Sequence, residues 1–302
     1  MKYLSKFYLP TNDEYNESND KYYPYNVFCD KHFSEIVFDD ITIFYGNNGS
    51  GKSTLLNIII KKLNKKQEVI KASRVKKKEI EKPEYEKYRG GFNSDNFSRQ
   101  CETELMLNIP VGSELISSED IFNYILQKRI DNEKKELERK RLDDDYWFAN
   151  SRSENAVPIS AFKNDMERYL EIARLRSAKS SKKLIESRVE KNEKELSNGQ
   201  TSLDYYNEKI KENRLYFLDE PENSLAPEYQ LELAKLIIEM SRFFKCQFVI
   251  ATHSPFILAL PYAKIYDLDA TPVKEKKWYE LENMKIYYDF FKSYKDKFEE
   301  NE

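Results

Sequence analysis

The chain has 302 residues, enough to bury a sizeable core in one large domain or two modest ones. Its formal net charge of −3, with 34% charged residues, does not single out nucleic acid, membrane or an acidic substrate as partner. Because no run of about 18 apolar residues occurs and Met1 to Pro10 lacks the apolar core of a secretory signal, we expect a cytoplasmic protein with no membrane partner.

The first predicted elements are a strand, a loop and a helix. Ile36 to Tyr45 is β-rich and leads directly into a loop that contains glycine. Apolar residues then recur at helical spacing from Leu55 to Leu63, which predicts a helix. Beyond the lysine-rich segment Lys61 to Lys87, we expect another strand at Glu104 to Pro110.

The middle of the chain is predicted to be a helical lobe over residues 117–199. Ser117, with Asp120 three residues later, is a helix-start signal. Glycine is then absent as far as Glu195, and the one proline, Pro158, predicts a break near Asn150 to Pro158. Roughly 75 residues at about 1.5 Å each, folded back once, are too few for a long coiled-coil arm.

Strands and helices alternate again in the last third. We predict strands at Leu215 to Asp219, Gln247 to Ala251 and Lys264 to Leu268, and a helix at Pro227 to Phe244. This order implies an α/β fold with a mainly parallel sheet covered by helices.

The loop after the first strand is a phosphate-binding loop, GNNGSGKST. In this pattern backbone N–H groups cradle phosphates, Lys52 reaches the β and γ phosphates and the hydroxyl of Ser53 binds magnesium. The alternative interpretation, an ordinary glycine turn with an exposed lysine, is less favoured, because a strand and a helix flank the loop as the phosphate-binding pattern requires. The predicted nucleotide-binding residues are Gly46, Asn47, Asn48, Gly49, Ser50, Gly51, Lys52, Ser53 and Thr54.

Two acidic residues close the strand Leu215 to Asp219. Asp219 would lie at the carboxyl end of the sheet, where a carboxylate can hold Mg²⁺. Glu220 is then placed to polarise the water that attacks ATP. Taken alone, two acidic residues after a strand more often belong to a solvated turn than to an active site. The presence of a phosphate loop in the same chain makes the active-site interpretation the better one.

Two further motifs complete the candidate site. His253 follows the strand Gln247 to Ala251 and is expected to contact the γ-phosphate. In LSNGQ, which contains Ser197 and Gly199, the serine is a typical helix cap. The free backbone N–H groups at the helix start that follows it are suited to binding phosphate. Arg174 to Arg188, just before this motif, is a basic stretch. Such stretches are most often solvated helix faces, and a surface that binds nucleic acid or a partner protein is the less favoured interpretation.

In chain order, the four strings GNNGSGKST, LSNGQ, LYFLDEPENSL and ATHS resemble the motifs of the ATP-binding cassette (ABC) ATPases, and the resemblance extends over nearly all of the chain. SNGQ, FLDEPENSL and QFVIATHSPF are similar to the soluble branch related to SMC- and RecF-like recombination and chromosome-maintenance ATPases. The resemblance implies one ABC ATPase domain over 1–302. Residues 1–116 and 200–302 would form the nucleotide-binding lobe with an antiparallel β subdomain, and 117–199 the helical lobe that ends in the signature motif.

The resemblance also implies function. It implies hydrolysis of ATP with Mg²⁺ in a homodimer, in which Ser197 and Gly199 reach the ATP of the other subunit. The output would be a switch on DNA or on an effector such as a nuclease, in genome maintenance or phage defence. The alternatives are the nucleotide-binding subunit of a membrane transporter and a sensor that does not hydrolyse.

Two assignments stay open within that resemblance. The Q-loop is either at Gln100 or at Ser117 to Glu119. Three tyrosines near the start of the chain, Tyr22, Tyr23 and Tyr25, are candidates for binding the adenine ring, and their spacing does not favour one over the others.

Overall fold

The computed structural model describes residues 2–10, 23–28, 31–67, 97–150, 167, 170, 174–175, 180–190, 198–223 and 225–299. These fall into two compact units, Met1–Phe122 with Ser197–Glu302, and Asn123–Leu196. Ser197, Tyr22, Pro158 and most of the lysine-rich segment lie outside the described residues.

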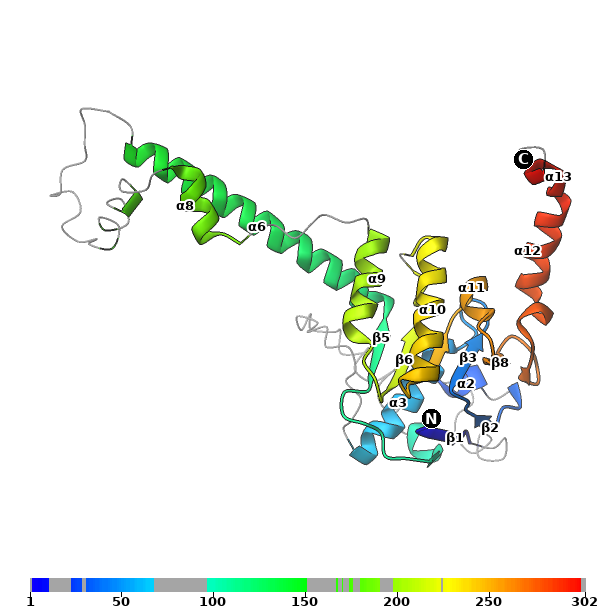
Figure 1. Ribbon diagram of the computed structural model, residues 1–302. Helices are drawn as coiled ribbons and strands as arrows, with labels where there is room; N and C mark the ends of the chain where they lie inside the picture. Colours follow the sequence, from blue (N-terminus) through cyan, green and yellow to red (C-terminus); the bar gives the residue numbers. More distant parts are fainter. Residues whose placement is uncertain are drawn as a thin grey trace. The chain divides into compact units, whose positions relative to one another are not determined.

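The first unit is built on a six-stranded sheet in the order β5-β6-β7-β3-β8-β9 (Figure 1). The first five strands in this order are parallel to their neighbours, and β9 is antiparallel to β8. The predicted mainly parallel α/β sheet is therefore confirmed. The strands are β3 (Ile41–Tyr45), β5 (Glu114–Ser117), β6 (Leu215–Asp219), β7 (Gln247–Ala251), β8 (Lys264–Asp267) and β9 (Lys274–Glu275).

A smaller antiparallel sheet, in the order β2-β1-β4, confirms the predicted antiparallel subdomain. Its strands are β1 (Leu4–Tyr8), β2 (Glu35–Val37) and β4 (Glu102–Leu105). The two sheets are joined by the buried amide of Gln247, which accepts from the backbone N–H groups of Tyr3 and Leu4 at 2.8 and 2.9 Å. It also donates to the carbonyl oxygen of Leu4 at 2.8 Å, so the buried polar group is satisfied.

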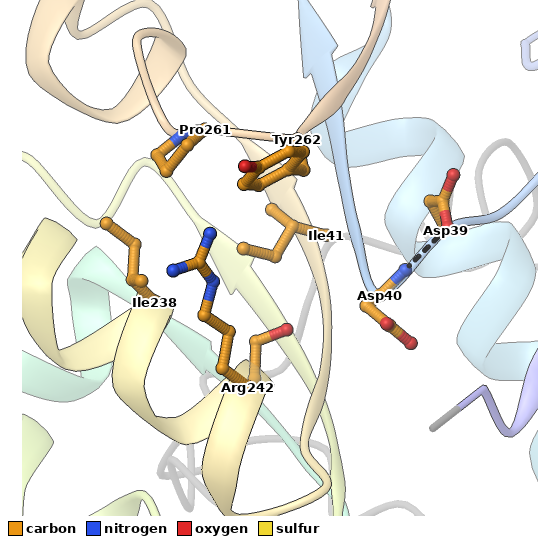
Figure 2. Close-up of a pocket in the computed structure, with 8 residues that line it drawn as sticks. Asp39, Asp40, Ile41, Ile238, Arg242, Pro261 and Tyr262 are labelled. Carbon is orange, nitrogen blue, oxygen red and sulfur yellow. Dashed lines mark hydrogen bonds between the residues drawn. The ribbon is translucent and has the colours of Figure 1, made fainter.

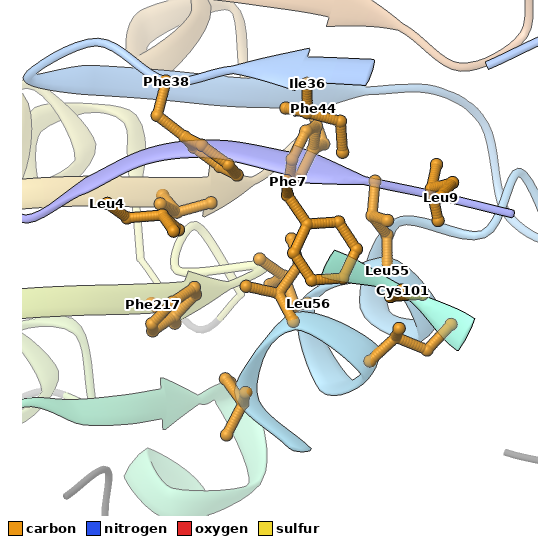
Figure 3. Packing of buried hydrophobic residues seen from close by; sticks show 14 of the residues in the cluster. Leu4, Phe7, Leu9, Ile36, Phe38, Phe44, Leu55, Leu56, Cys101 and Phe217 are labelled. Atoms are coloured by element: carbon orange, nitrogen blue, oxygen red, sulfur yellow. The ribbon is translucent and has the colours of Figure 1, made fainter. Parts of the chain in front are cut away.

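The core lies between the two sheets and the helix α3 (Lys52–Gln67). Phe7 of the small sheet, Phe44 and Phe217 of the large sheet, and Leu55 and Leu56 of α3 are all buried in it (Figure 3). Strand β3 is buried along its whole length, as expected for a strand covered on both faces. Burial of this apolar surface fixes the loop between β3 and α3.

Helices flank these strands in the first unit (Figure 1). The predicted helix after Pro227 is confirmed as α10, with proline in its first turn. Besides α3, the described helices of this unit include α2 (Tyr25–Phe28), α9 (Asn198–Lys209), α10 itself (Pro227–Phe243), α11 (Pro255–Leu258), the 3-10 helix η3 (Trp278–Glu280), α12 (Glu282–Ser293) and α13 (Lys295–Glu299).

Helix α6 (Ser118–Asn150) starts in the first unit and continues through the second. Ser117 caps it as predicted, because the N–H of Asp120 donates to Ser117 Oγ at 3.3 Å while Ser117 N–H donates to Asp120 Oδ2 at 2.9 Å. Its 33 residues span roughly 50 Å, and it ends at Asn150, where we expected a break. Beside it in the second unit, α8 (Ser181–Arg188) is followed by Glu190, whose carbonyl oxygen accepts from Arg139 at 2.7 Å.

Two expectations about strands were wrong in detail. The segment Ile36 to Tyr45 is not one strand, because β2 pairs with β1 in the small sheet whereas β3 pairs with β7 and β8 in the large one. The strand expected at Glu104 to Pro110 is β4, which ends at Leu105. Its partner β1 begins at Leu4, so the strand pairing ends at Leu105, although the backbone N–H of Met106 still donates to the carbonyl oxygen of Tyr3 at 2.9 Å. The side chains of Met106 and Leu107 are exposed.

Candidate functional site

The phosphate loop joins the end of β3 to the start of α3, as predicted. Gly49 and Gly51 have φ angles of +84° and +101°, which side-chain-bearing residues rarely adopt. A β-carbon at Gly51 would lie 2.6 Å from Cγ1 of Val27, and one at Gly46 would lie 2.5 Å from Oγ of Ser50. Glycine is therefore required at Gly51 by both backbone conformation and space.

Lys52 is buried and folds back over its own loop. Its ammonium group donates to the carbonyl oxygens of Gly46 at 2.6 Å and Asn47 at 3.2 Å, and lies 3.9 Å from Oε1 of Glu220. A phosphate bound on the loop would give this ammonium a charged acceptor in place of two neutral ones.

Ser53 and Asp219, which are 166 residues apart in the sequence, are in direct contact. Ser53 Oγ donates to Asp219 Oδ1 at 2.9 Å. Burial raises the pKa of Asp219 from 3.8 to about 6, against the opposing effects of Ser53 and Lys52. A hydroxyl and a carboxylate are the hard oxygen ligands that Mg²⁺ takes, and a cation there would offset the cost of the buried charge. The two residues therefore fit a magnesium site.

Glu220 is held in a backbone conformation unusual for a residue with a side chain, with φ of +47°. Its N–H donates to the carbonyl oxygen of Ala251 at 2.9 Å, and its Oε2 accepts from the side-chain amide of Asn223 at 3.0 Å. With Lys52 on its other oxygen, the carboxylate is fixed beside the phosphate loop. A strained and doubly held carboxylate is typical of a functional position.

His253 is connected to this group through Glu222, a residue that the sequence analysis did not single out. Glu222 is 6% exposed, and its Oε1 accepts from the backbone N–H of His253 at 2.9 Å and lies 3.3 Å from the ring Nδ1. Ser254 Oγ, next in sequence, donates to Oε1 of Gln230 at 2.6 Å. The loop after β7 is thus tied both to the segment after β6 and to α10.

Two more residues missed by sequence reasoning support the phosphate loop from behind. Asp269 Oδ2 accepts from the backbone N–H of Asn47 at 2.8 Å. Lys31 donates to the carbonyl oxygens of Leu268, at 2.7 Å, and of Ser50, and burial lowers the pKa of its amine. Neither residue belongs to a recognisable pattern, because each acts through contacts between distant parts of the chain.

The signature segment LSNGQ is described from Asn198 onward, where α9 begins. A β-carbon at Gly199 would lie 2.6 Å from the ring of Tyr229 on α10, so this glycine has a packing role in its own subunit. The role of Ser197 and Gly199 in binding the ATP of another subunit stays a prediction.

The open candidates for the Q-loop and the adenine have contacts of their own. Tyr25 is buried and its hydroxyl donates to Oε1 of Gln100 at 2.8 Å, while Ser117 caps α6. Tyr23 is more exposed and its hydroxyl donates to Oγ1 of Thr54, within the loop motif, at 3.0 Å. Of the two candidate tyrosines that the structure describes, Tyr23 thus contacts the loop motif through its hydroxyl.

A pocket of about 420 Å³ lies at the opposite end of β3 (Figure 2). It is lined by Asp40 and Ile41 at the start of that strand and by Arg242 and Tyr262, with the guanidinium 5.0 Å from the tyrosine ring centre. Since the phosphate loop follows the other end of β3, this pocket is not the nucleotide site.

Comparisons with known proteins identify two ATPase families. Residues 35–223 match the family described as ABC transporter, and residues 203–258 match that described as AAA ATPase domain. No curated protein matches. Within the described residues, no helix is long and apolar enough to cross a membrane.

The solved structures that are similar to the chain include an ABC transporter and an Smc head domain. One is a metal-chelate type ABC transporter in an inward-facing conformation, at 18% identity over 93% of this chain and 86% of that one, with a TM-score of 0.40. The other is the Smc head domain with an extended coiled coil bound to the C-terminal domain of ScpA from Pyrococcus furiosus. It is 15% identical over 96% of this chain and 100% of that one, with a TM-score of 0.40. The first family match spans well over half of the chain.

Proposed function

Because the chain belongs to the ABC-type P-loop ATPases, which bind and hydrolyse ATP, we propose that it closes head to tail as a homodimer around two ATP molecules. Each subunit supplies one half of each site, and hydrolysis separates the pair. The observation that carries the proposal is the cluster of Lys52, Ser53, Asp219 and Glu220, drawn together by contacts of 2.9 and 3.9 Å.

The residues of this half-site have separate roles in the proposal. The loop N–H groups and Lys52 bind the β and γ phosphates, and Ser53 and Asp219 hold the magnesium ion, which neutralises charge as it develops on the phosphates. Glu220 orients the attacking water, and its contacts with Asn223 and Lys52 keep the carboxylate in place before ATP arrives. His253 donates to the γ-phosphate from a position set by Glu222.

Ser197 and Gly199 complete the site of the second subunit. The motivation is the helix start at Asn198, whose N–H groups favour an anion. Two bound nucleotides then act as ligands of the interface, so dimer stability follows the nucleotide state.

A mixing experiment tests the shared site. Lys52→Ala and Ser197→Arg proteins should each be inactive, while an equal mixture should recover about a quarter of wild-type turnover, since half of the dimers then hold one intact site of two. Recovery requires the signature of one chain to serve the phosphate loop of the other. If the mixture is as inactive as its components, although both variants are folded, the shared site is wrong.

For the output of the cycle we propose a switch acting on DNA or on an effector protein such as a nuclease. Support comes from the resemblance of its motifs to the recombination and chromosome-maintenance branch, and from Arg174, Lys182, Lys183 and Arg188 in the second unit. Direct DNA binding predicts turnover stimulated by duplex DNA and weakened steeply by salt. Turnover indifferent to DNA and salt would favour the protein effector.

The family description also supports a second candidate, the nucleotide-binding subunit of a membrane transporter. Copurification with a permease from native membranes would favour this candidate over the switch. Recovery with a nuclease or with DNA would favour the switch.

A further inference from the structure

The two C-terminal helices, α12 and α13 (Figure 1), carry a face of apolar side chains that the described part of the chain leaves exposed. The side chains on it are 44 to 62% exposed, and some of their rings contact one another in tilted or edge-on geometry. The ring centres of Phe290 and Tyr294 are 5.0 Å apart, and those of Phe291 and Phe298 are 6.1 Å apart. We call this surface the α12 aromatic face. It consists of Ile286, Tyr287, Phe290, Phe291, Tyr294 and Phe298.

The exposure is not a general property of these helices, because α12 has a distinct charged side. At 100° per residue, Glu282, Lys285, Asp289 and Lys292 fall on one stripe, opposite Tyr287 and Tyr294. A helix that separates its charged residues from its apolar residues in this way is built to bury the apolar side.

The start of α12 is fixed to the phosphate loop. Leu281 and Met284 are buried, the side-chain amide of Asn283 donates to Oδ1 of Asn47 at 3.1 Å, and the backbone N–H of Asn283 donates to the hydroxyl of Tyr45 at 3.3 Å. The aromatic face therefore begins beside the loop that binds ATP.

The size of the face indicates what covers it. A fully exposed aromatic side chain offers on the order of 200 Å², so six side chains about half exposed present roughly 600 Å². A stable interface buries about 800 Å² on each partner, and monomers seldom expose apolar patches larger than a few hundred Å². The face is thus too small to hold a dimer alone but forms most of an interface that a neighbouring surface completes.

The net charge of α12 and α13 distinguishes a protein partner from nucleic acid or anionic lipid. Residues 282–299 contain four acidic residues and four lysines, so they carry no net charge. Nucleic acid and anionic lipid both require a basic surface. A neutral, aromatic surface next to a nucleotide site instead suits another protein surface of the same kind.

We propose that the α12 aromatic face packs against the second copy of this chain and forms part of the subunit interface of the nucleotide-bound dimer. The inference rests on the proposed function, since the surface around the phosphate loop supplies the remaining area. Because Asn283 contacts Asn47, closure of the dimer on α12 and occupation of the loop by ATP stabilise each other.

The test compares dimer dissociation constants by mass photometry in a Glu220→Gln background with ATP and Mg²⁺. Phe290→Ser with Tyr294→Ser alters the aromatic face, and Lys285→Gln with Lys292→Gln is the matched control on the charged stripe of the same helix. All four side chains are exposed, and circular dichroism and nucleotide binding check that each protein is folded. We expect the aromatic variant to raise the dissociation constant at least ten-fold and the control to change it less than two-fold.

Each other outcome has a distinct meaning. If the background protein dimerises with ATP and the aromatic variant dimerises equally well, the face is not part of the interface, although the proposed ATP dimer stands. If the background protein stays monomeric with ATP, the proposed function and this inference both fail. If the substitutions abolish binding to anionic vesicles and leave the dimer intact, the occupant is a membrane, and the inference is overturned.

Discussion

The carboxylate of Glu222 accepts a hydrogen bond of 2.9 Å from the backbone N–H of His253, 31 residues later in the chain. The same oxygen lies 3.3 Å from the imidazole Nδ1. Glu222 is only two residues from Glu220, so the segment that carries the carboxylate proposed to orient water also contacts the histidine. Glu220 and His253, the two residues proposed to act on the γ-phosphate and the water, are therefore held by one short segment.

The first prediction concerns this contact. Glu222→Ala should lower kcat on the order of ten-fold with little change in KM for ATP, because it acts by positioning His253 and not by binding the nucleotide. Glu222→Gln keeps an oxygen for the backbone N–H of His253 and should lose less. Steady-state turnover of both variants measures the difference.

A double-variant cycle provides the control. If Glu222 acts through His253, the Glu222→Ala/His253→Ala protein should be no slower than His253→Ala alone. Multiplicative losses in the double variant would show that Glu222 has an independent role.

The second prediction follows from the raised pKa of Asp219. A buried carboxyl whose pKa rises from 3.8 to about 6 costs nothing below pH 3.8, and its cost to stability grows as the pH rises to 6 and is constant above. Asp219→Asn removes the charge and should raise the free energy of unfolding at pH 8, without magnesium or nucleotide, by about 1 to 3 kcal/mol.

Urea unfolding of wild type and variant at pH 8 and pH 5, in a chelator, measures this difference. The gain should be smaller at pH 5, where most of the carboxyl is already protonated in the folded state. If the free energy of unfolding of the variant at pH 8 is equal to or lower than that of wild type, the charge on Asp219 does not destabilise the apo protein.

The third prediction separates two demands on glycine in the phosphate loop. Gly49 and Gly51 both have positive φ, but only Gly51 has a neighbour, Val27, within 2.6 Å of the added β-carbon. Gly49→Ala should cost about 1 kcal/mol in the apo protein for its backbone conformation. Gly51→Ala should cost about 1 to 3 kcal/mol more, as expected for forced overpacking.

Thermal unfolding without nucleotide ranks the two alanine variants. Equal losses would show that Val27 moves aside freely and that backbone conformation is the whole requirement at Gly51.

The sequence predicted those parts of the site whose chemistry is local. The glycine loop, Lys52 and Ser53 are contiguous, and Asp219 and Glu220 end an apolar strand, so a pattern finds them, and parallel strands then bring them to one edge. Glu222, Lys31 and Asp269 could not be found this way. Asp269 reaches Asn47 across 222 residues, a contact that exists only once β8 has paired with β3.

The errors in the predicted strands have a similar origin. Hydrophobicity along Ile36 to Tyr45 is continuous, but the neighbours of β2 and β3 belong to different sheets. Met106 and Leu107 have the composition of a strand, but the pairing of β4 with β1 ends at Leu105 and their side chains are exposed. Strand boundaries depend on pairing partners that the local sequence does not specify.

The central claim is that ATP joins two copies of this chain through Lys52, Glu220 and the signature segment. Sedimentation velocity of Glu220→Gln protein with saturating ATP and Mg²⁺ tests it most directly, with Lys52→Ala protein as the control that should not respond to ATP. Because the variant binds ATP but does not hydrolyse it, we predict a dimer with ATP and a monomer without it. A Glu220→Gln protein that binds ATP and remains monomeric would contradict the account.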